Sequence, residues 1–275
     1  MFLDVDKALR EKNPKLYKRI PKFLIRWIER LIHQDEMNGF LKENIDRSSI
    51  EFATKTIDFF GVKFKAIQEE NIPKTGRYIV VCNHPLGGID GMALISAVGK
   101  QRKDIKFPVN DLLMQLTPMH EVFIPVNKHG RNTQNAAQQL NDVFASDEMI
   151  LYFPAGLCSR KQNGIVRDLA WKKTIIAKAK EYQRDIIPAY FEGENSNRFY
   201  NIANWRKKLG IKVNIEMIFL PDEAFRQKGK ELFVIFGRSI SYQQFDQTKN
   251  EKEWAEWLKN EVYELKNELN DGKNN

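Results

Sequence analysis

The fold is decided by an apolar run that leads into a polar, glycine-containing segment: Arg77-Tyr78-Ile79-Val80-Val81-Cys82-Asn83-His84-Pro85-Leu86-Gly87-Gly88-Ile89-Asp90-Gly91. Residues 77–82 predict a short buried strand, because β-branched and aromatic residues dominate them. In open α/β sheets, ligands collect beyond the carboxyl ends of the strands. His84 comes directly after this strand and is therefore placed where a functional site is expected.

Strand-like and helix-like segments alternate along the rest of the chain from about residue 62. We expect further strands at 122–126, 149–153, 186–191, 213–220 and 232–236, and helices from 92, at 132–144, at 171–182 and at 251–269. Such alternation predicts an α/β fold with a mainly parallel or mixed central sheet flanked by helices. The expected domain spans residues 61–269, and the polar residues 270–275 are expected to form a frayed tail.

Residues 1–60 are expected to form a helical N-terminal extension. Within residues 21–32, apolar residues recur at 24, 27, 28, 31 and 32, while Lys22, Arg26 and Arg30 share another face. This pattern is typical of an amphipathic helix. A basic face opposite Trp27 and leucine suits a membrane interface, but the stripe could equally pack on the rest of the protein.

Bulk composition narrows the class of protein. The 275 residues are 42% hydrophobic and 29% charged, with a formal net charge of +8. This balance allows a real core and suits an anionic partner: phospholipid, nucleic acid or an acidic carrier protein. Nucleic acid is not expected, because no aromatic residues are interleaved with a basic stripe. With no secretory signal and no apolar stretch of about 18–20 residues, membrane association would be peripheral.

The segment 83–91 carries residues suited to general-base catalysis. A neutral imidazole at His84 can remove a proton from a hydroxyl, and a carboxylate on its other nitrogen would fix the tautomer. Asp90 is close enough in sequence to serve, although it could simply cap the following helix, and His84 could be an ordinary loop histidine. Gly87 and Gly88 permit close approach of a substrate, and backbone amides there could stabilise an oxyanion.

Cysteine chemistry is a less favoured alternative. Cys82 and Cys158 form no disulfide framework and no zinc spacing, so free thiols in a reducing cytoplasm are expected. Cys158 could act as a nucleophile with His84 as its base. A buried or incidental cysteine is the preferred interpretation, and no metal site is expected.

Residues 83–91 resemble the first block of the glycerolipid (lysophospholipid) acyltransferase superfamily. They are most similar to its hemolysin-like and ornithine- or glycine-lipid branches, in which five residues separate the histidine from the aspartate, as they do here. The resemblance implies that His84 deprotonates the acceptor and that Asp90 orients His84.

Later segments resemble further blocks of the superfamily in the expected order. Residues 153–160 resemble the Phe-Pro-Glu-Gly-Thr-Arg-Ser block, with Ala155 in place of the glutamate linked to glycerol-phosphate acceptors. Residues 123–128 resemble the second block without its usual arginine, and residues 186–188 resemble the apolar-proline block. The expected substrate-binding residues are Gly87, Gly88, Lys128, Arg131, Gly156, Ser159 and Arg160. Arg160 would hold a phosphate or carboxylate headgroup from a cationic loop.

The resemblance implies transfer of a fatty acyl group from an acyl-carrier-protein or coenzyme A thioester to the hydroxyl of a lyso-lipid. The acceptor would be a monoacyl amino-acid lipid or lysophosphatidic acid, in membrane lipid biosynthesis. The enzyme would act peripherally at an anionic membrane surface, on the cytoplasmic face of the cell membrane, with no bound cofactor. The alternative is a non-catalytic peripheral protein that binds membrane lipid.

Overall fold

The apolar run at the start of the decisive segment forms β2 (Tyr78–Cys82), which lies at the centre of the main sheet. The structure is a computed structural model, and it describes residues 3–12, 14–110, 113–126 and 133–273. β2 pairs in parallel with β8 (Asp185–Phe191) on one side and with β5 (Met149–Tyr152) on the other. The predicted buried strand is confirmed.

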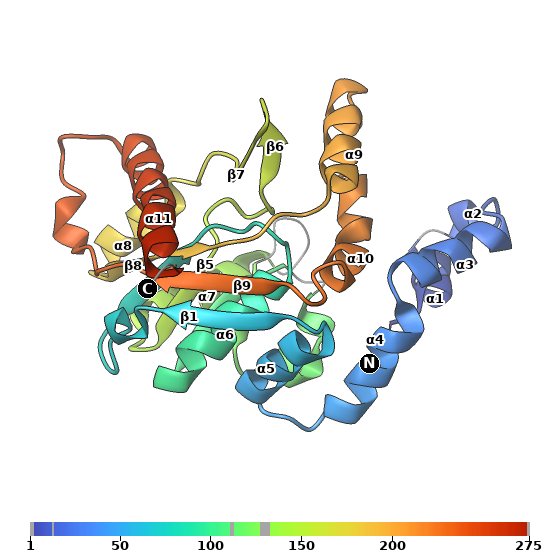
Figure 1. Cartoon of the computed structure of the whole chain (residues 1–275), viewed down its shortest axis with the longest axis horizontal. Coiled ribbons are helices and arrows are strands. Elements are labelled where there is room, and N and C mark those ends of the chain that lie inside the picture. Colours follow the sequence, from blue (N-terminus) through green and yellow to red (C-terminus); the bar gives the residue numbers. More distant parts are fainter. Residues whose placement is uncertain (1–2, 13, 111–112, 127–132, 274–275) are drawn as a thin grey trace.

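Seven strands form this sheet in the order β1-β9-β8-β2-β5-β3-β4 (Figure 1). The four not yet bounded are β1 (Lys63–Ile67), β9 (Glu231–Phe236), β3 (Ile105–Val109) and β4 (Phe123–Pro125). Every pairing in the sheet is parallel except that between β8 and β9, which is antiparallel. The predicted mixed α/β sheet is therefore confirmed. A separate antiparallel hairpin joins β6 (Arg160–Gln162) to β7 (Ile165–Arg167).

Helices cover both faces of the sheet, which explains why β2 has no polar alternation. Val80 and Cys82 point into the cluster that includes α5 (Ser49–Phe59) and α6 (Ile89–Gln101). Ile79 and Val81 point into the cluster that includes α7 (Thr133–Ala145), α8 (Thr174–Glu181) and α11 (Glu251–Lys273). A strand buried on both faces reads as a continuous hydrophobic run.

The N-terminal residues are helical, as expected. They form α1 (Val5–Lys12), α2 (Pro14–Tyr17), α3 (Lys22–Leu31), α4 (Gln34–Asn44) and α5. Phe40 and Leu41 of α4 share the buried cluster of α5 and α6, so the later part of this region belongs to the core of the sheet domain. In Figure 1, α1 to α3 project from one side of that domain.

The prediction of a strand at 213–220 is wrong. These residues form a 3-10 turn, η4 (Ile215–Phe219), and the start of α10 (Leu220–Phe225), and both come after α9 (Asn197–Lys208). Pro221 lies in the first turn of α10, where proline favours a helix start. Apolar residues such as Val213 and Ile218 are exposed here and not packed in a sheet. An apolar run therefore indicated a buried strand where the chain instead exposes its hydrophobic residues.

The remaining elements complete the chain. They are the short 3-10 turns η1 (Glu69–Asn71), η2 (Leu113–Gln115), η3 (Thr117–Met119) and η5 (Tyr242–Gln244). α11 continues to Lys273, so residues 270–273 are helical, in contrast to the predicted frayed tail. Among the described helices, none is both long enough and apolar enough to span a bilayer.

Candidate active site

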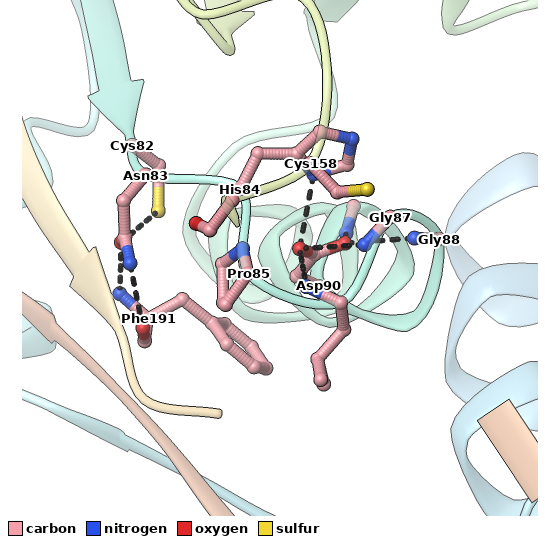
Figure 2. A network of polar contacts seen from close by, with 12 residues as sticks. Cys82, Asn83, His84, Pro85, Gly87, Gly88, Asp90, Cys158 and Phe191 are labelled. Carbon is pink, nitrogen blue, oxygen red and sulfur yellow. Dashed lines mark hydrogen bonds and ion pairs between the residues drawn. The ribbon is translucent and has the colours of Figure 1, made fainter. Parts of the chain in front are cut away.

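The loop after β2 is anchored to the neighbouring strand by Asn83. Its side-chain Nδ2 donates to the Phe191 carbonyl at 2.9 Å, and the Phe191 amide donates back to Asn83 Oδ1 at 2.7 Å (Figure 2). Asn83 is buried, so both bonds form away from water. This pairing holds the end of β2 beside the end of β8, and the next residue in the chain is His84.

Asp90, in the first turn of α6, holds the glycine-containing loop between β2 and α6 in place. Its carboxylate is fully buried (0% exposed) in the first turn of α6. Backbone amides of the loop donate to it from Leu86 (2.8 Å), Gly87 (3.2 Å) and Gly88 (3.0 Å), and the Gly91 amide of α6 donates at 3.0 Å. These bonds and the positive end of the helix dipole stabilise a buried negative charge. Asp90 therefore orders the helix start and remains available to a histidine.

The structure brings His84 and Asp90 together. His84 Nδ1 lies 3.0 Å from Asp90 Oδ2, and the imidazole side chain is 16% exposed. The ring stacks on Phe153 with centroids 4.1 Å apart and planes 19° apart. Because the carboxylate binds the proton on Nδ1, Nε2 carries the lone pair. Figure 2 shows Asp90 beneath the imidazole, with the glycine amides around it.

His84 and Asp90 each shift the pKa of the other. Burial lowers the pKa of His84, but the charge and the hydrogen bond of Asp90 raise it more, and the net effect is a raised pKa. For Asp90, burial raises the pKa, while the imidazole and the loop amides outweigh it and leave the pKa lowered. The site is thus built to stabilise an imidazolium next to a carboxylate.

A second buried carboxylate, Asp168, holds His84 from its backbone side. The His84 amide and the Ser159 hydroxyl donate to Asp168 Oδ1 at 3.2 Å and 2.6 Å. The Trp171 indole donates to Oδ2 at 2.9 Å, and the Asp168 amide donates to the Tyr263 hydroxyl of α11 at 2.8 Å. Sequence reasoning missed this residue, because Asp168 belongs to no recognised block and His84 lies 84 positions away from it in the chain.

Ser159 and Arg160 are placed differently from the expected cationic loop. Both side chains are buried, and the Ser159 hydroxyl donates to the Asp168 carboxylate. The Arg160 guanidinium donates to Glu216 at 2.8 Å and to the Cys158 carbonyl at 2.5 Å. A buried guanidinium requires such partners. The expectation that Arg160 holds a headgroup from a cationic loop is not met by this arrangement: in this structure Arg160 ties the loop to η4. No motif pointed to Glu216.

Two of the expected substrate-binding glycines, Gly87 and Gly156, have backbone conformations that favour glycine. Gly87 has φ +80°, and a Cβ there would lie 2.8 Å from Leu220. Gly156 has φ +64°, and a Cβ there would lie 2.5 Å from the Lys172 ammonium. Since the amides of Gly87 and Gly88 already donate to Asp90, the expectation that they form an oxyanion hole is not met by this arrangement.

The sequence also singles out Lys128, Arg131 and Cys158. Lys128 and Arg131 lie outside the described residues. Cys158 is buried, and burial raises the pKa of its thiol to about 11, which disfavours a thiolate nucleophile. Within the described part of the chain, no three His, Cys, Asp or Glu side chains gather to hold a metal ion.

The sheet, its two helical layers and the buried His84–Asp90 pair define an α/β protein with a candidate general base beyond the carboxyl end of a central strand. The chain belongs to the Acyltransferase family, whose model matches residues 7–272. The non-catalytic alternative is thereby set aside, and the resemblance found in the sequence is confirmed.

Two curated relatives match almost the whole chain. A lyso-glycine lipid O-acyltransferase of Bacteroides thetaiotaomicron is 46% identical, over 96% of this chain and 97% of that protein. A second protein of the same name, from Phocaeicola vulgatus, is 42% identical, over 96% of this chain and 95% of that protein. A solved structure, the 1-acyl-sn-glycerophosphate acyltransferase PlsC from Thermotoga maritima, is similar with a TM-score of 0.48 and 18% identity, covering 79% of this chain and 78% of the other.

Proposed function

We propose that this enzyme transfers a fatty acyl group from an acyl-carrier-protein or coenzyme A thioester to the hydroxyl of a lyso-lipid at the cytoplasmic face of the cell membrane. The observation that carries the proposal is the buried Asp90 carboxylate on His84 Nδ1, which leaves Nε2 to accept a proton. The preferred acceptor is a lyso-glycine lipid. Both curated relatives act on it by name, and Ala155 replaces the glutamate linked to glycerol-phosphate acceptors.

In the proposed reaction, His84 Nε2 takes the proton of the acceptor hydroxyl as its oxygen attacks the thioester carbonyl carbon. Asp90 stabilises the imidazolium that forms. The tetrahedral intermediate then collapses, the carbon–sulfur bond breaks, and the leaving thiolate takes the proton from the imidazolium. The products are an ester and a free thiol, and His84 returns to its starting state.

The test is acyl transfer by the purified protein from acyl-carrier-protein or coenzyme A thioesters to a panel of lyso-lipids, with products identified by mass spectrometry. His84→Ala should lower the rate on the order of 10²–10⁴-fold, because it removes the general base. The matched control is His120→Ala, since His120 is exposed and, among the described residues, its ring bonds the Met114 carbonyl and no side chain. A wild-type rate in His84→Ala would contradict the mechanism.

A further inference from the structure

The exposed apolar side chains of this protein are concentrated in two segments. Of the eleven large hydrophobic residues that are most exposed in the described chain, nine lie at positions 23–27 and 205–218. The first segment is the start of α3, with Phe23 73% exposed. The second runs from the end of α9 through η4, with Leu209 67% and Val213 70% exposed. Exposed apolar surface gathered in this way marks an interaction site.

The second segment, which we call the 205–218 surface, combines apolar and basic side chains. Its exposed apolar members are Trp205, Leu209, Ile211, Val213, Ile215 and Ile218. Lys207, Lys208 and Lys212 are exposed among them, and Lys208 Nζ lies 5.5 Å from the centre of the Trp205 ring. Its one acidic residue, Glu216, is fully buried against Arg160 and Arg206. The exposed part of this surface is therefore apolar and positively charged.

The two segments adjoin each other. The Trp27 ring of α3 contacts the Phe219 ring of η4, with centroids 6.3 Å apart. Both segments belong to the part of the molecule that carries α1 to α3 and α9 to α10, away from α8 and α11 (Figure 1). Arg26 and Arg30 of α3 are also exposed. The positive charge thus extends across both segments.

Buried contacts beneath the 205–218 surface connect it to the loops of the active site. Glu216 pairs with Arg160 at 2.8 Å, and the next residue toward the N-terminus, Ser159, donates its amide to the His84 carbonyl at 2.7 Å. Leu220, directly after η4, lies against Gly87. A partner bound at this surface would therefore sit beside the loops that carry His84 and Asp90.

We propose that the 205–218 surface docks, together with the start of α3, on an anionic lipid bilayer. Tryptophan and aliphatic side chains among lysines suit the boundary between headgroups and acyl chains, and the lysines attract anionic headgroups. This rests on the proposed function in one respect: a lyso-lipid acceptor resides in a membrane, and this docking would bring it to His84 without passage through water.

The test measures vesicle binding without substrates, and acyl transfer separately. The full chain is sedimented with vesicles of equal phosphatidylglycerol and phosphatidylcholine, or of phosphatidylcholine alone. We expect binding to the anionic vesicles, and Leu209→Asp/Val213→Asp should weaken it tenfold or more. The matched control, Gln243→Asp/Gln247→Asp, adds the same charge at exposed positions before α11 and should bind like the wild type.

Acyl transfer to a short-chain, water-soluble acceptor should stay within about twofold of wild type in both double variants, which also shows that they fold. If the wild type transfers no acyl group to this acceptor, the proposed function is contradicted. The vesicle-binding result still tests the docking proposal in that case. Undiminished vesicle binding by Leu209→Asp/Val213→Asp, or no binding by the wild type, would overturn the docking proposal. A dimer in light scattering that this variant dissociates would assign the surface to a second copy and also overturn it.

Discussion

At the scale of single residues, Asp90 determines how His84 titrates. The carboxylate raises the pKa of His84 above its ordinary 6.5, against the effect of burial. In the proposed mechanism His84 must be neutral to act as a general base, so we expect activity to be lost as the pH falls through this raised pKa. The acidic limb of the pH profile therefore reports the strength of the His84–Asp90 interaction.

Asp90→Asn keeps the shape of the side chain and one carbonyl oxygen but removes the charge. We expect kcat/KM to fall on the order of 10²–10⁴-fold, since the imidazolium loses its partner. The acidic limb of the residual activity should move to lower pH, because burial lowers the pKa of His84 and the charge of Asp90 no longer raises it. The measurement is kcat/KM against pH. Asp46→Asn, at an exposed position, is the control and should keep the wild-type profile. A limb that stays in place would show that Asp90 does not govern the base.

The sequence predicts His84 and Asp90 because both lie in one short loop. Their partners are different: the His84–Asp168 bond joins residues 84 positions apart, and the Arg160–Glu216 bond joins residues 56 positions apart. No local pattern encodes such pairs. For the same reason Arg160 reads as a free cation in the sequence, whereas the fold brings a buried carboxylate to it.

At the scale of secondary-structure elements, the sequence predicts a strand correctly where both faces of the strand are buried. β2, β5, β8 and β9 are almost wholly apolar, and the sequence predicts them with ends shifted by a residue or two. It misses β1, because this is an edge strand whose Lys63 and Lys65 face solvent. It misses β3 as well, which contains Lys106 and Pro108. Pro108 is tolerated because β3 pairs with β5 only at Ile105 and Lys106, so no β5 residue requires the N–H that proline lacks.

The packing of α5 on α6 depends on a glycine inside a helix. A Cβ on Gly99 would lie 2.6 Å from Ile50 Cγ2 and 2.9 Å from Ile50 Cγ1. Gly99→Ala would gain helix propensity of about 1 kcal/mol, but forcing these atoms apart typically costs about 1–3 kcal/mol. Since Ile50 is β-branched and stiff, we expect the clash to prevail and the free energy of unfolding in urea to fall.

Two further variants separate the effect of the clash with Ile50 on the free energy of unfolding from the effect of helix propensity. Gly39→Ala in α4 is the matched control, because a Cβ there has no atom within 4 Å, and it should be neutral or stabilising. Gly99→Ala combined with Ile50→Ala should cost less than the sum of the two single changes, since the smaller side chain makes room. Additive effects would mean that the two side chains do not compete for space.

At the scale of the whole molecule, Asp222 of α10 links the N-terminal helices to the rest. Its carboxylate accepts from His33, between α3 and α4, at 3.2 Å, and from Arg226 at 2.9 Å. Arg198 of α9 also donates to it. Burial raises the pKa of Asp222, but these three partners outweigh burial and lower it to about 2, from 3.8. One side chain therefore joins three separate parts of the chain.

Asp222→Asn should lower the free energy of unfolding by roughly 1–2 kcal/mol near neutral pH, after allowance for solvent screening of these partly exposed groups. Because the folded pKa lies below the unfolded one, this stabilisation is fully present above 3.8 and is lost as the pH falls through about 2. Urea unfolding of wild type and variant across this range should therefore converge in acid. The control Asp58→Asn, whose carboxylate is 62% exposed beside Lys55, should stay within about 0.5 kcal/mol of the wild type. A stability difference that persists unchanged at pH 2 would mean that shape, and not charge, at Asp222 holds the N-terminal helices to the domain.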